Sequence, residues 1–238
     1  MIEVELPGAR VVFTTRGGGV SEGPYSSLNL GVLTDDDPGH VSTNRGLLAR
    51  ALGVDPRSVA MGWQVHGAQI EEWDGPPPPG RDGFARPGAE LSRVDGHLTS
   101  DAGVALLVLV ADCLPVALAV PGRVAMLHCG WRGLAAGILE RGVASFEDPP
   151  AAAVGPAIGG CCYEVGQEVL DAFAGMDGVA RDRMLDVRAL AEAKLRAAGV
   201  DRVEHVDLCT SCRADLFFSH RRDGGITGRQ AAVIERTR

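Results

Sequence analysis

The most apolar part of the chain, residues 103–132, is divided into short segments. Pro115 prevents one continuous helix, and Pro121 followed by Gly122 is typical of a turn. Hydrophobic runs of this length between turn signals are typical of buried strands. We therefore predict three buried strands, followed by a helix over residues 130–140 that begins at Gly130. The predicted strands cover residues 104–110, 114–120 and 124–127.

Elsewhere in the chain, segments with the hydrophobic period of a helix alternate with short hydrophobic runs typical of strands. Asp37 and Asp186 are predicted N-caps, and Gly53 is a predicted helix end. The predicted helices cover residues 38–52, 165–174 and 187–198. The predicted strands cover residues 10–15, 58–61, 69–73, 152–154, 203–206 and 231–234, the second and third of them as a pair. This mixture predicts an α/β fold with layered α-β-α architecture around a mixed sheet.

Domain organisation follows from length and composition. The chain has 238 residues, of which 45% are hydrophobic, and we expect one domain over residues 1–238. Residues 74–90 are rich in Pro and Gly and are predicted to form a flexible surface loop. We treat this loop as an insertion within the domain.

Net charge, the apolar run and the N-terminal sequence limit the partners and the location that we expect. A net charge of −8 opposes binding to nucleic acid. The apolar run of residues 103–132 contains Asp112 and lacks aromatic belts, so we expect no membrane association. The N-terminus lacks the pattern of a signal peptide, which predicts a cytoplasmic protein.

Three reactive side chains lie at predicted strand ends. Cys113 follows the first strand of the apolar region, His128 ends the third, and His66 lies between two others. A free Cys in a buried strand is usually a small hydrophobic residue, so Cys113 by itself is weak evidence for a reactive site.

Four other cysteines have roles that stay open. They are the adjacent Cys161 and Cys162, and Cys209 and Cys212 in C-x-x-C spacing. A lone C-x-x-C is weak evidence for zinc or for redox chemistry.

Two further features suit an anion. Arg16 opens a Gly-rich segment, residues 16–31, and Arg132 lies at the predicted helix start, where free backbone amides favour negative charge. A basic cluster near the C-terminus is compatible with a solvated face, ion pairs or anion binding. Its members are Arg213, His220, Arg221, Arg222 and Arg229.

Nine motifs are spread over nearly the whole chain. They are residues 14–21 (Thr-Thr-Arg-Gly-Gly-Gly-Val-Ser), 27–31 (Ser-Leu-Asn-Leu-Gly), 64–67 (Gln-Val-His-Gly), 95–101, 111–115 (Ala-Asp-Cys-Leu-Pro), 128–132 (His-Cys-Gly-Trp-Arg), 155–159 (Gly-Pro-Ala-Ile-Gly), 162–166 (Cys-Tyr-Glu-Val-Gly) and 217–230. Together and in this order they closely resemble the bacterial laccase-domain or polyphenol oxidase family, and the loop of residues 74–90 is the one departure.

The resemblance implies a metal centre and a reaction. Matching positions make His66, Cys113 and His128 the metal ligands and catalytic residues, with zinc as the expected metal and copper as the alternative. Family members are described as purine nucleoside phosphorylases that act on adenosine, inosine and methylthioadenosine with phosphate and also deaminate adenosine. A fold similar to that of cysteine-dependent deamidase toxins is expected.

Substrate contacts are assigned as hypotheses on this basis. Arg16 and Arg132 are expected to bind phosphate, and Asn29 and Gln64 the nucleoside. The sequence does not choose between Asp112 and Glu164 as general acid or base. His40, His97, His205 and His220 do not match ligand positions.

Other functions stay open at this stage. One is a copper-dependent polyphenol oxidase, although six histidines leave few for a multicopper centre once two are assigned. Another is a cysteine hydrolase that uses Cys113 with His128. The third is a metal-binding protein without catalysis.

Overall fold

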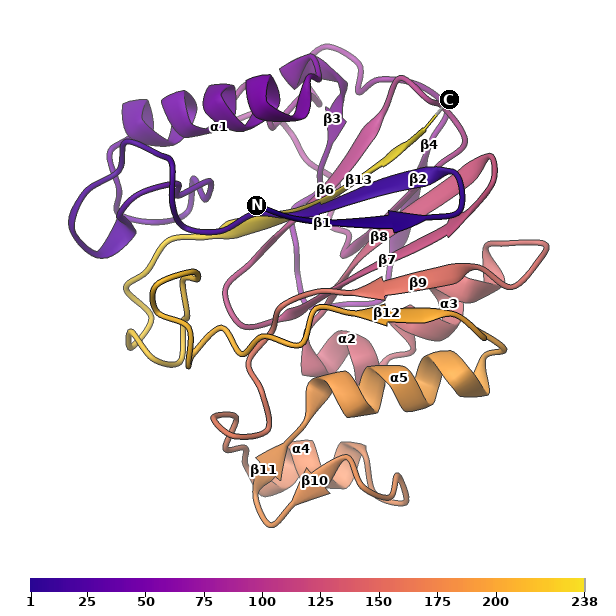
Figure 1. The fold of residues 1–238 in the computed structure, drawn as a ribbon. Helices are drawn as coiled ribbons and strands as arrows, with labels where there is room; N and C mark the ends of the chain where they lie inside the picture. Colours follow the sequence, from indigo (N-terminus) through magenta and orange to yellow (C-terminus); the bar gives the residue numbers. More distant parts are fainter. Residues whose placement is uncertain (238) are drawn as a thin grey trace.

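Two β-sheets lie face to face between helices in the computed structural model, which describes residues 1–237 (Figure 1). Helix α1 (Pro38–Leu52) covers the outer face of one sheet, and three helices on the other side cover the second (Figure 1). These are α2 (Trp131–Ala135), α3 (Ile138–Ala144) and α5 (Val187–Ala197). The predicted layered α/β class is confirmed, with two mixed sheets in place of the single one expected.

The first sheet has five strands and brings both ends of the chain together. Its order is β1-β2-β13-β6-β3, antiparallel except for the β3–β6 pair. The strands are β1 (Ile2–Leu6), β2 (Ala9–Phe13), β3 (Val59–Ala60), β6 (Ala105–Val110) and β13 (Gln230–Arg236). The predictions for β2, β6 and β13 are confirmed within two residues, and β1 was not predicted.

The second sheet has six strands in the order β12-β9-β7-β8-β5-β4, with parallel pairs at its two edges. The strands are β4 (Ile70–Trp73), β5 (Gly96–Thr99), β7 (Leu114–Val120), β8 (Arg123–Cys129), β9 (Ala151–Val154) and β12 (Val203–His205). The predicted turn joins β7 to β8, and Gly122 there adopts a positive φ of 98°. Strand β8 extends past its predicted end to include His128.

Continuous apolar runs in the central strands follow from burial on both faces. Along β7, Leu118 packs toward the helices, whereas Ala117 packs against the other sheet. Along β6, Val108 faces the space between the sheets and Leu107 faces α1. Because both faces of these strands are covered, apolar residues occupy every position instead of every second one.

The helix caps behave as the sequence predicts. The carboxylate of Asp37 accepts from the Gly39 and His40 amides, and that of Asp186 accepts from the Arg188 and Ala189 amides. Gly53 ends α1 in the left-handed conformation with a φ of 77°.

Several element boundaries differ from the prediction. The helix expected over residues 130–140 is two helices, α2 and α3, because Gly137 between them has a φ of 85°. The helix expected over residues 165–174 is the shorter α4 (Gln167–Ala172). Smaller elements were not predicted. They are the 3-10 helices η1 (Gly23–Tyr25) and η2 (Pro56–Ser58), and the strands β10 (Ala180–Arg181) and β11 (Met184–Leu185).

The predicted strand pair of residues 58–61 and 69–73 is wrong. Strand β3 belongs to the five-stranded sheet and β4 to the six-stranded sheet, so the chain crosses between sheets over residues 61–69. Residues 74–90 form neither helix nor strand, as expected. However, Phe84 within them is 1% exposed, and Arg45 of α1 donates to the Gly83 and Phe84 carbonyls. Part of this loop is therefore packed into the core.

None of the helices in residues 1–237 has the length and apolar character needed to cross a membrane.

Candidate metal centre

The three predicted ligands come together where the chain passes between the sheets. His66 lies in the crossing from β3 to β4, and Cys113 lies in the crossing from β6 to β7. His128 is on β8, the neighbour of β7 in the six-stranded sheet. Their ligand atoms all lie within 4.8 Å of one another. The structure thus places the predicted nitrogen, sulfur and nitrogen donors in one group.

The distances fit a single tetrahedral ion. The His66 Nε2 and Cys113 Sγ atoms are 3.7 Å apart. The ring centroids of His66 and His128 are 4.9 Å apart, and the ring planes meet at 75°. Usual Zn–N and Zn–S bond lengths place such donors about 3.5 Å apart around zinc. Three protein ligands leave a fourth position free for another molecule, as in catalytic zinc sites.

Asp95 connects the two histidine segments and was not singled out from the sequence as a functional residue. Its buried carboxylate lies 2.7 Å from the His128 Nδ1 atom and accepts from the backbone amides of Val65, His66 and Gly67. The Asp95 carbonyl also accepts from the His128 amide. A carboxylate at Nδ1 leaves Nε2 free for metal and fixes the ring orientation.

Local electrostatics favour a thiolate. Burial opposes charge on Cys113, but the neighbouring His128 and His66 outweigh it and lower the Cys113 pKa to about 6. Burial likewise opposes charge on His128, but Cys113 and Asp95 outweigh it and raise the His128 pKa to about 9. Without metal, the pair is therefore a thiolate beside an imidazolium at neutral pH.

A cavity of about 730 Å³ opens beside the three ligands. Its walls come from the loop after the Gly-rich segment, from α1, from the 83–91 loop and from the end of β6. The wall is mostly apolar, with Met61, Leu91 and Leu109 among its side chains, and Trp63 is 45% exposed there. Such a cavity suits a small ligand with a flat apolar part and a few polar groups.

Of the predicted substrate contacts, one reaches this cavity. Gln64 lines it, but its side-chain amide is held by the Leu109 backbone, at 2.7 Å to the carbonyl and 2.8 Å to the amide. Asn29 is fully buried and does not line the cavity. Its amide group donates to Thr34 and Asp36, and its oxygen accepts from Gly31 and Arg229 amides. Asn29 therefore holds residues of the cavity wall in place without lining the cavity itself.

The arginines predicted to bind phosphate lie outside the cavity lining. Arg16 donates to the Ser26 and Ala214 carbonyls and lies over the Phe218 ring. Arg132 is exposed and lies over the Trp131 ring. The structure gives Arg16 a role in joining the Gly-rich loop to the C-terminal segment, because it donates to a backbone carbonyl of each.

Neither predicted acid or base lines the cavity. The buried Asp112 carboxylate accepts from the Thr210 hydroxyl at 2.6 Å and from the Arg221 amide at 2.7 Å. Asp112 has a φ of 89°, so these bonds hold the tight turn that presents Cys113. Glu164 is exposed and lies near Arg183.

Five polar residues in the cavity were not assigned to it from the sequence. They are Thr34, Asp36, Arg45, His220 and Arg229. Arg45 is 3% exposed, and its Nη2 atom has no hydrogen-bond partner among residues 1–237. Burial lowers the Arg45 pKa to about 10. Arg229 is held through Nη1 by the Thr227 and Gly228 carbonyls.

The C-terminal basic cluster is thereby divided. Arg213 and Arg222 pair with Asp215 and Asp223, whereas Arg229 and His220 face the cavity. Long-range contacts cause this division, and sequence order gives no signal of it. The remaining histidines lie elsewhere: His97 accepts from the buried Trp73 indole, His40 lies near Asp36, and His205 pairs with Glu192.

A sequence model of the family described as multi-copper polyphenol oxidoreductase laccase matches residues 10–237. The chain belongs to this family. The predicted resemblance is confirmed. Within residues 1–237, the one group of candidate ligands that contains histidine is His66, Cys113 and His128.

Curated relatives in the family carry phosphorylase names. The protein named purine nucleoside phosphorylase SCO2081 of Streptomyces coelicolor is 42% identical over 241 residues, which are 95% of each chain. The protein named purine nucleoside phosphorylase YfiH of Escherichia coli is 39% identical over 240 residues, covering 95% of this chain and 93% of its own.

Solved structures show the same fold. The crystal structure of YlmD from Geobacillus stearothermophilus has a TM-score of 0.90 and 36% identity, covering 97% of this chain and 93% of its own. Neisseria meningitidis protein NMB0706 has a TM-score of 0.85 and 33% identity, covering 100% of this chain and 99% of its own.

Proposed function

We propose that the chain is a cytoplasmic, metal-dependent purine nucleoside phosphorylase for adenosine, inosine and methylthioadenosine, and that it also deaminates adenosine. The observation that carries the proposal is the cavity, whose wall includes the His66, Cys113 and His128 donors and two arginines that pair with no carboxylate of residues 1–237. The phosphorylase names of the relatives support the same reaction.

The apolar wall would hold the purine. Trp63 offers an exposed indole face in the cavity, and stacking of a base on an aromatic ring contributes about 1–3 kcal/mol. Met61 and Leu109 add apolar contact area around the same space. The ring nitrogens of the purine and its amino or carbonyl group at C6 would then remain available to polar groups.

Arg229 would bind phosphate. Its Nη1 atom is anchored to backbone carbonyls, so its remaining donors can be directed at an anion in fixed geometry. Burial lowers the Arg229 pKa, and the negative charges of Cys113 and Asp112 oppose that shift. Arg45 is a second donor through its unpartnered Nη2 atom.

Phosphorolysis forms a bond from a phosphate oxygen to the sugar's anomeric carbon and breaks that carbon's bond to the purine. The departing purine takes up a proton. His220 is the imidazole in the cavity outside the ligand group, and imidazole is the commonest acid–base group in enzymes. We assign the proton transfer to His220, replacing Asp112 and Glu164.

The metal that we expect is zinc, with copper as the alternative. A zinc ion bound by His66, Cys113 and His128 would supply a Lewis acid with one open position. Asp95 would keep His128 in the tautomer that can bind it.

A second candidate, a cysteine hydrolase, is favoured by one observation. Cys113, His128 and Asp95 lie in the order of a thiol, an imidazole and an orienting carboxylate, the arrangement of a catalytic triad. Activity that survives metal removal and is then lost on alkylation of Cys113 would favour the hydrolase.

The test is product analysis with adenosine, with and without phosphate, on zinc-loaded protein, metal-stripped protein and Cys113→Ala. The proposal expects adenine and ribose 1-phosphate only with phosphate, and their loss in both altered samples. Inosine from adenosine without phosphate would show the deaminase activity. If zinc-loaded protein gives no product, the nucleoside proposal is wrong, and phenol oxidation with copper-loaded protein becomes the next assay.

A further inference from the structure

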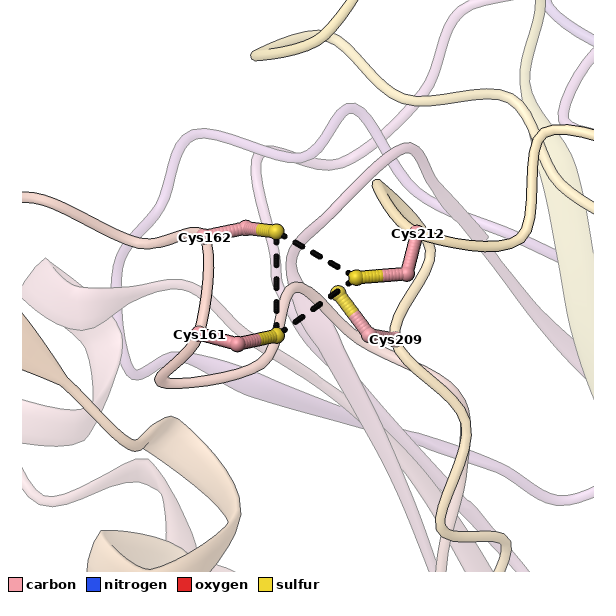
Figure 2. Close-up of side chains that lie close together, drawn as sticks. All are labelled: Cys161, Cys162, Cys209 and Cys212. Atoms are coloured by element: carbon pink, nitrogen blue, oxygen red, sulfur yellow. Dashed lines mark hydrogen bonds between the residues drawn. The ribbon is translucent and has the colours of Figure 1, made fainter.

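Four cysteines that the reaction does not use form a second group of donors (Figure 2). Cys161 and Cys162 lie in the turn after β9, and Cys209 and Cys212 lie in the segment after β12. About fifty residues separate the two pairs in the chain, yet the four Sγ atoms lie within 4.8 Å of one another. Figure 2 shows the four side chains converging from two loops.

The spacing of the sulfurs matches one tetrahedral ion. Cys162 and Cys212 have Sγ atoms 3.4 Å apart, and Cys161 Sγ lies 3.6 Å from each of them. Four thiolates around one zinc ion stand about 3.8 Å apart, from the usual Zn–S bond length. A disulfide requires about 2.05 Å, and iron–sulfur clusters hold their cysteines farther apart because several irons lie between them.

We infer that Cys161, Cys162, Cys209 and Cys212 bind a second metal ion, a four-coordinate Zn²⁺ held by four thiolates. Binding displaces the thiol protons to water, and the resulting complex carries two negative charges. With four protein ligands, no position remains for substrate, so this ion has a structural role. None of the four cysteines lines the cavity, and the inference does not depend on the proposed reaction.

The surroundings suit a negatively charged thiolate group. The Gly159 amide donates to Cys209 Sγ at 3.2 Å. The largely buried Arg188 side chain approaches the same place: a Cβ atom at Gly159 would lie 3.0 Å from Arg188 Nη2 and 3.3 Å from Cys161 Sγ. Gly159 therefore allows an amide donor and a cation to lie beside the sulfurs.

The second ion would also fasten the two loops that support Cys113. Next to the first cysteine pair, the Ile158 amide donates to the Asp112 carbonyl at 3.0 Å. Within the second pair, the Thr210 hydroxyl donates to the Asp112 carboxylate at 2.6 Å. Both loops thus hold the residue directly before Cys113. A metal that joins the loops stabilises this turn.

The test measures zinc by elemental analysis in protein purified with a reducing agent. Wild type is expected to contain about two zinc ions per chain, because each ligand group binds one. Cys113→Ala/His66→Ala keeps a single ligand of the first group and is expected to retain about one. Adding Cys209→Ser and Cys212→Ser to that variant should remove the remaining zinc. Cys129→Ala is the matched control, since Cys129 is the cysteine outside both groups, and it should keep the wild-type content.

A second readout does not depend on how the Cys209→Ser and Cys212→Ser substitutions affect folding. Cobalt loaded into Cys113→Ala/His66→Ala should give the sulfur-to-metal charge-transfer absorption of a tetrathiolate site. The inference is wrong if this variant holds no metal and shows no such absorption. It is also wrong if intact mass shows a disulfide among the four cysteines of the reduced preparation. Because the first ligand group is already disabled in this variant, failure of the phosphorylase proposal leaves the result unaffected.

Discussion

At the scale of single residues, Asp95 controls the candidate metal centre without being a ligand. One carboxylate holds the His128 ring and three consecutive amides around His66. His66 has an uncommon positive φ of 59°. The hydrogen bonds from the three amides to Asp95 hold the backbone in this conformation. The ligand geometry therefore depends on a residue that lies behind the ligands.

We predict that Asp95→Asn weakens zinc binding at this centre about 10–100-fold. An asparagine amide would donate to His128 Nδ1 and favour the tautomer whose Nε2 is protonated and cannot bind metal. Competition titration with a chromogenic chelator measures the change. Asp215→Asn is the control, since Asp215 is exposed and pairs with Arg213 on the surface. Equal affinities for the two variants would contradict the prediction.

The pKa shifts at the centre predict the pH dependence of metal binding. The thiolate of Cys113, with a pKa of about 6, is already charged at pH 7, whereas His128, with a pKa of about 9, keeps its proton. Zinc must displace that proton, so its affinity should rise about tenfold per pH unit between pH 7 and 9. Titrations of the Cys209→Ser/Cys212→Ser variant at pH 7, 8 and 9 check this. A flat profile would show that His128 is neutral without metal.

Substitutions at Arg229 and Arg132 test whether phosphate binds in the observed cavity or at the helix start predicted from the sequence. Arg229→Gln is expected to raise the KM for phosphate about 10–100-fold, because a charged hydrogen bond contributes about 1.5–3 kcal/mol. Arg132→Gln should change it little, since Arg132 is exposed outside the cavity lining. Phosphate-dependent initial rates measure both. The reverse ranking would restore the helix-start site.

At the scale of elements, helix α2 begins against the metal ligands. Its N-cap, Gly130, has a φ of −71° and a ψ of 161°, which any residue adopts. A Cβ atom there would nevertheless lie 2.7 Å from the His66 ring and 3.5 Å from Cys113 Sγ. Close packing of this helix start against the ligands, and not backbone conformation, requires glycine.

We predict that Gly130→Ala displaces His66 and reduces zinc binding at the first centre while the fold persists. Gly166→Ala is the matched control, because Gly166 is also an N-cap with extended backbone and a Cβ atom there would meet nothing within 4 Å. Zinc titration and circular dichroism of the two variants give the comparison. Undiminished zinc affinity in Gly130→Ala would show that the ligands tolerate the contact.

At the scale of the whole molecule, the residues of the first candidate metal centre come from the region between the two sheets. His66 and Cys113 lie in separate crossings between the sheets, and His128 belongs to the six-stranded sheet. An ion bound by all three residues would hold the two stacked sheets together at one end. A ligand that binds only the folded state adds to stability in proportion to the logarithm of its concentration.

We predict that zinc at 100 times its Kd raises the free energy of unfolding by about 2.7 kcal/mol through this centre. Urea unfolding of the Cys209→Ser/Cys212→Ser variant, with zinc and with chelator, isolates the effect from the second cysteine group. Adding Cys113→Ala should abolish it. A zinc effect of equal size after that addition would place the stabilising ion elsewhere.

Local signals carried most of the predicted elements. The Asp37 and Asp186 caps, the Gly53 helix end and the turn at Gly122 depend on residues within a few positions, so sequence patterns find them. The split at Gly137 was missed because an isolated glycine inside an apolar helical pattern is compatible with a continuous helix. Strand β1 was missed although Ile2, Val4 and Leu6 alternate with two glutamates, which is the pattern of a half-buried strand.

The sequence by itself determined the local elements, the α/β class and, through family motifs, the three candidate ligands of the first metal centre. Tertiary structure alone decided which strands share a sheet, because pairing depends on contacts between distant residues. It also assigned Arg229 to the cavity and Asn29 to the wall behind it, brought Asp95 to both histidine segments, and joined two separate cysteine pairs into one site. Each of these outcomes depends on where backbone crossings place side chains, and composition and spacing do not specify that.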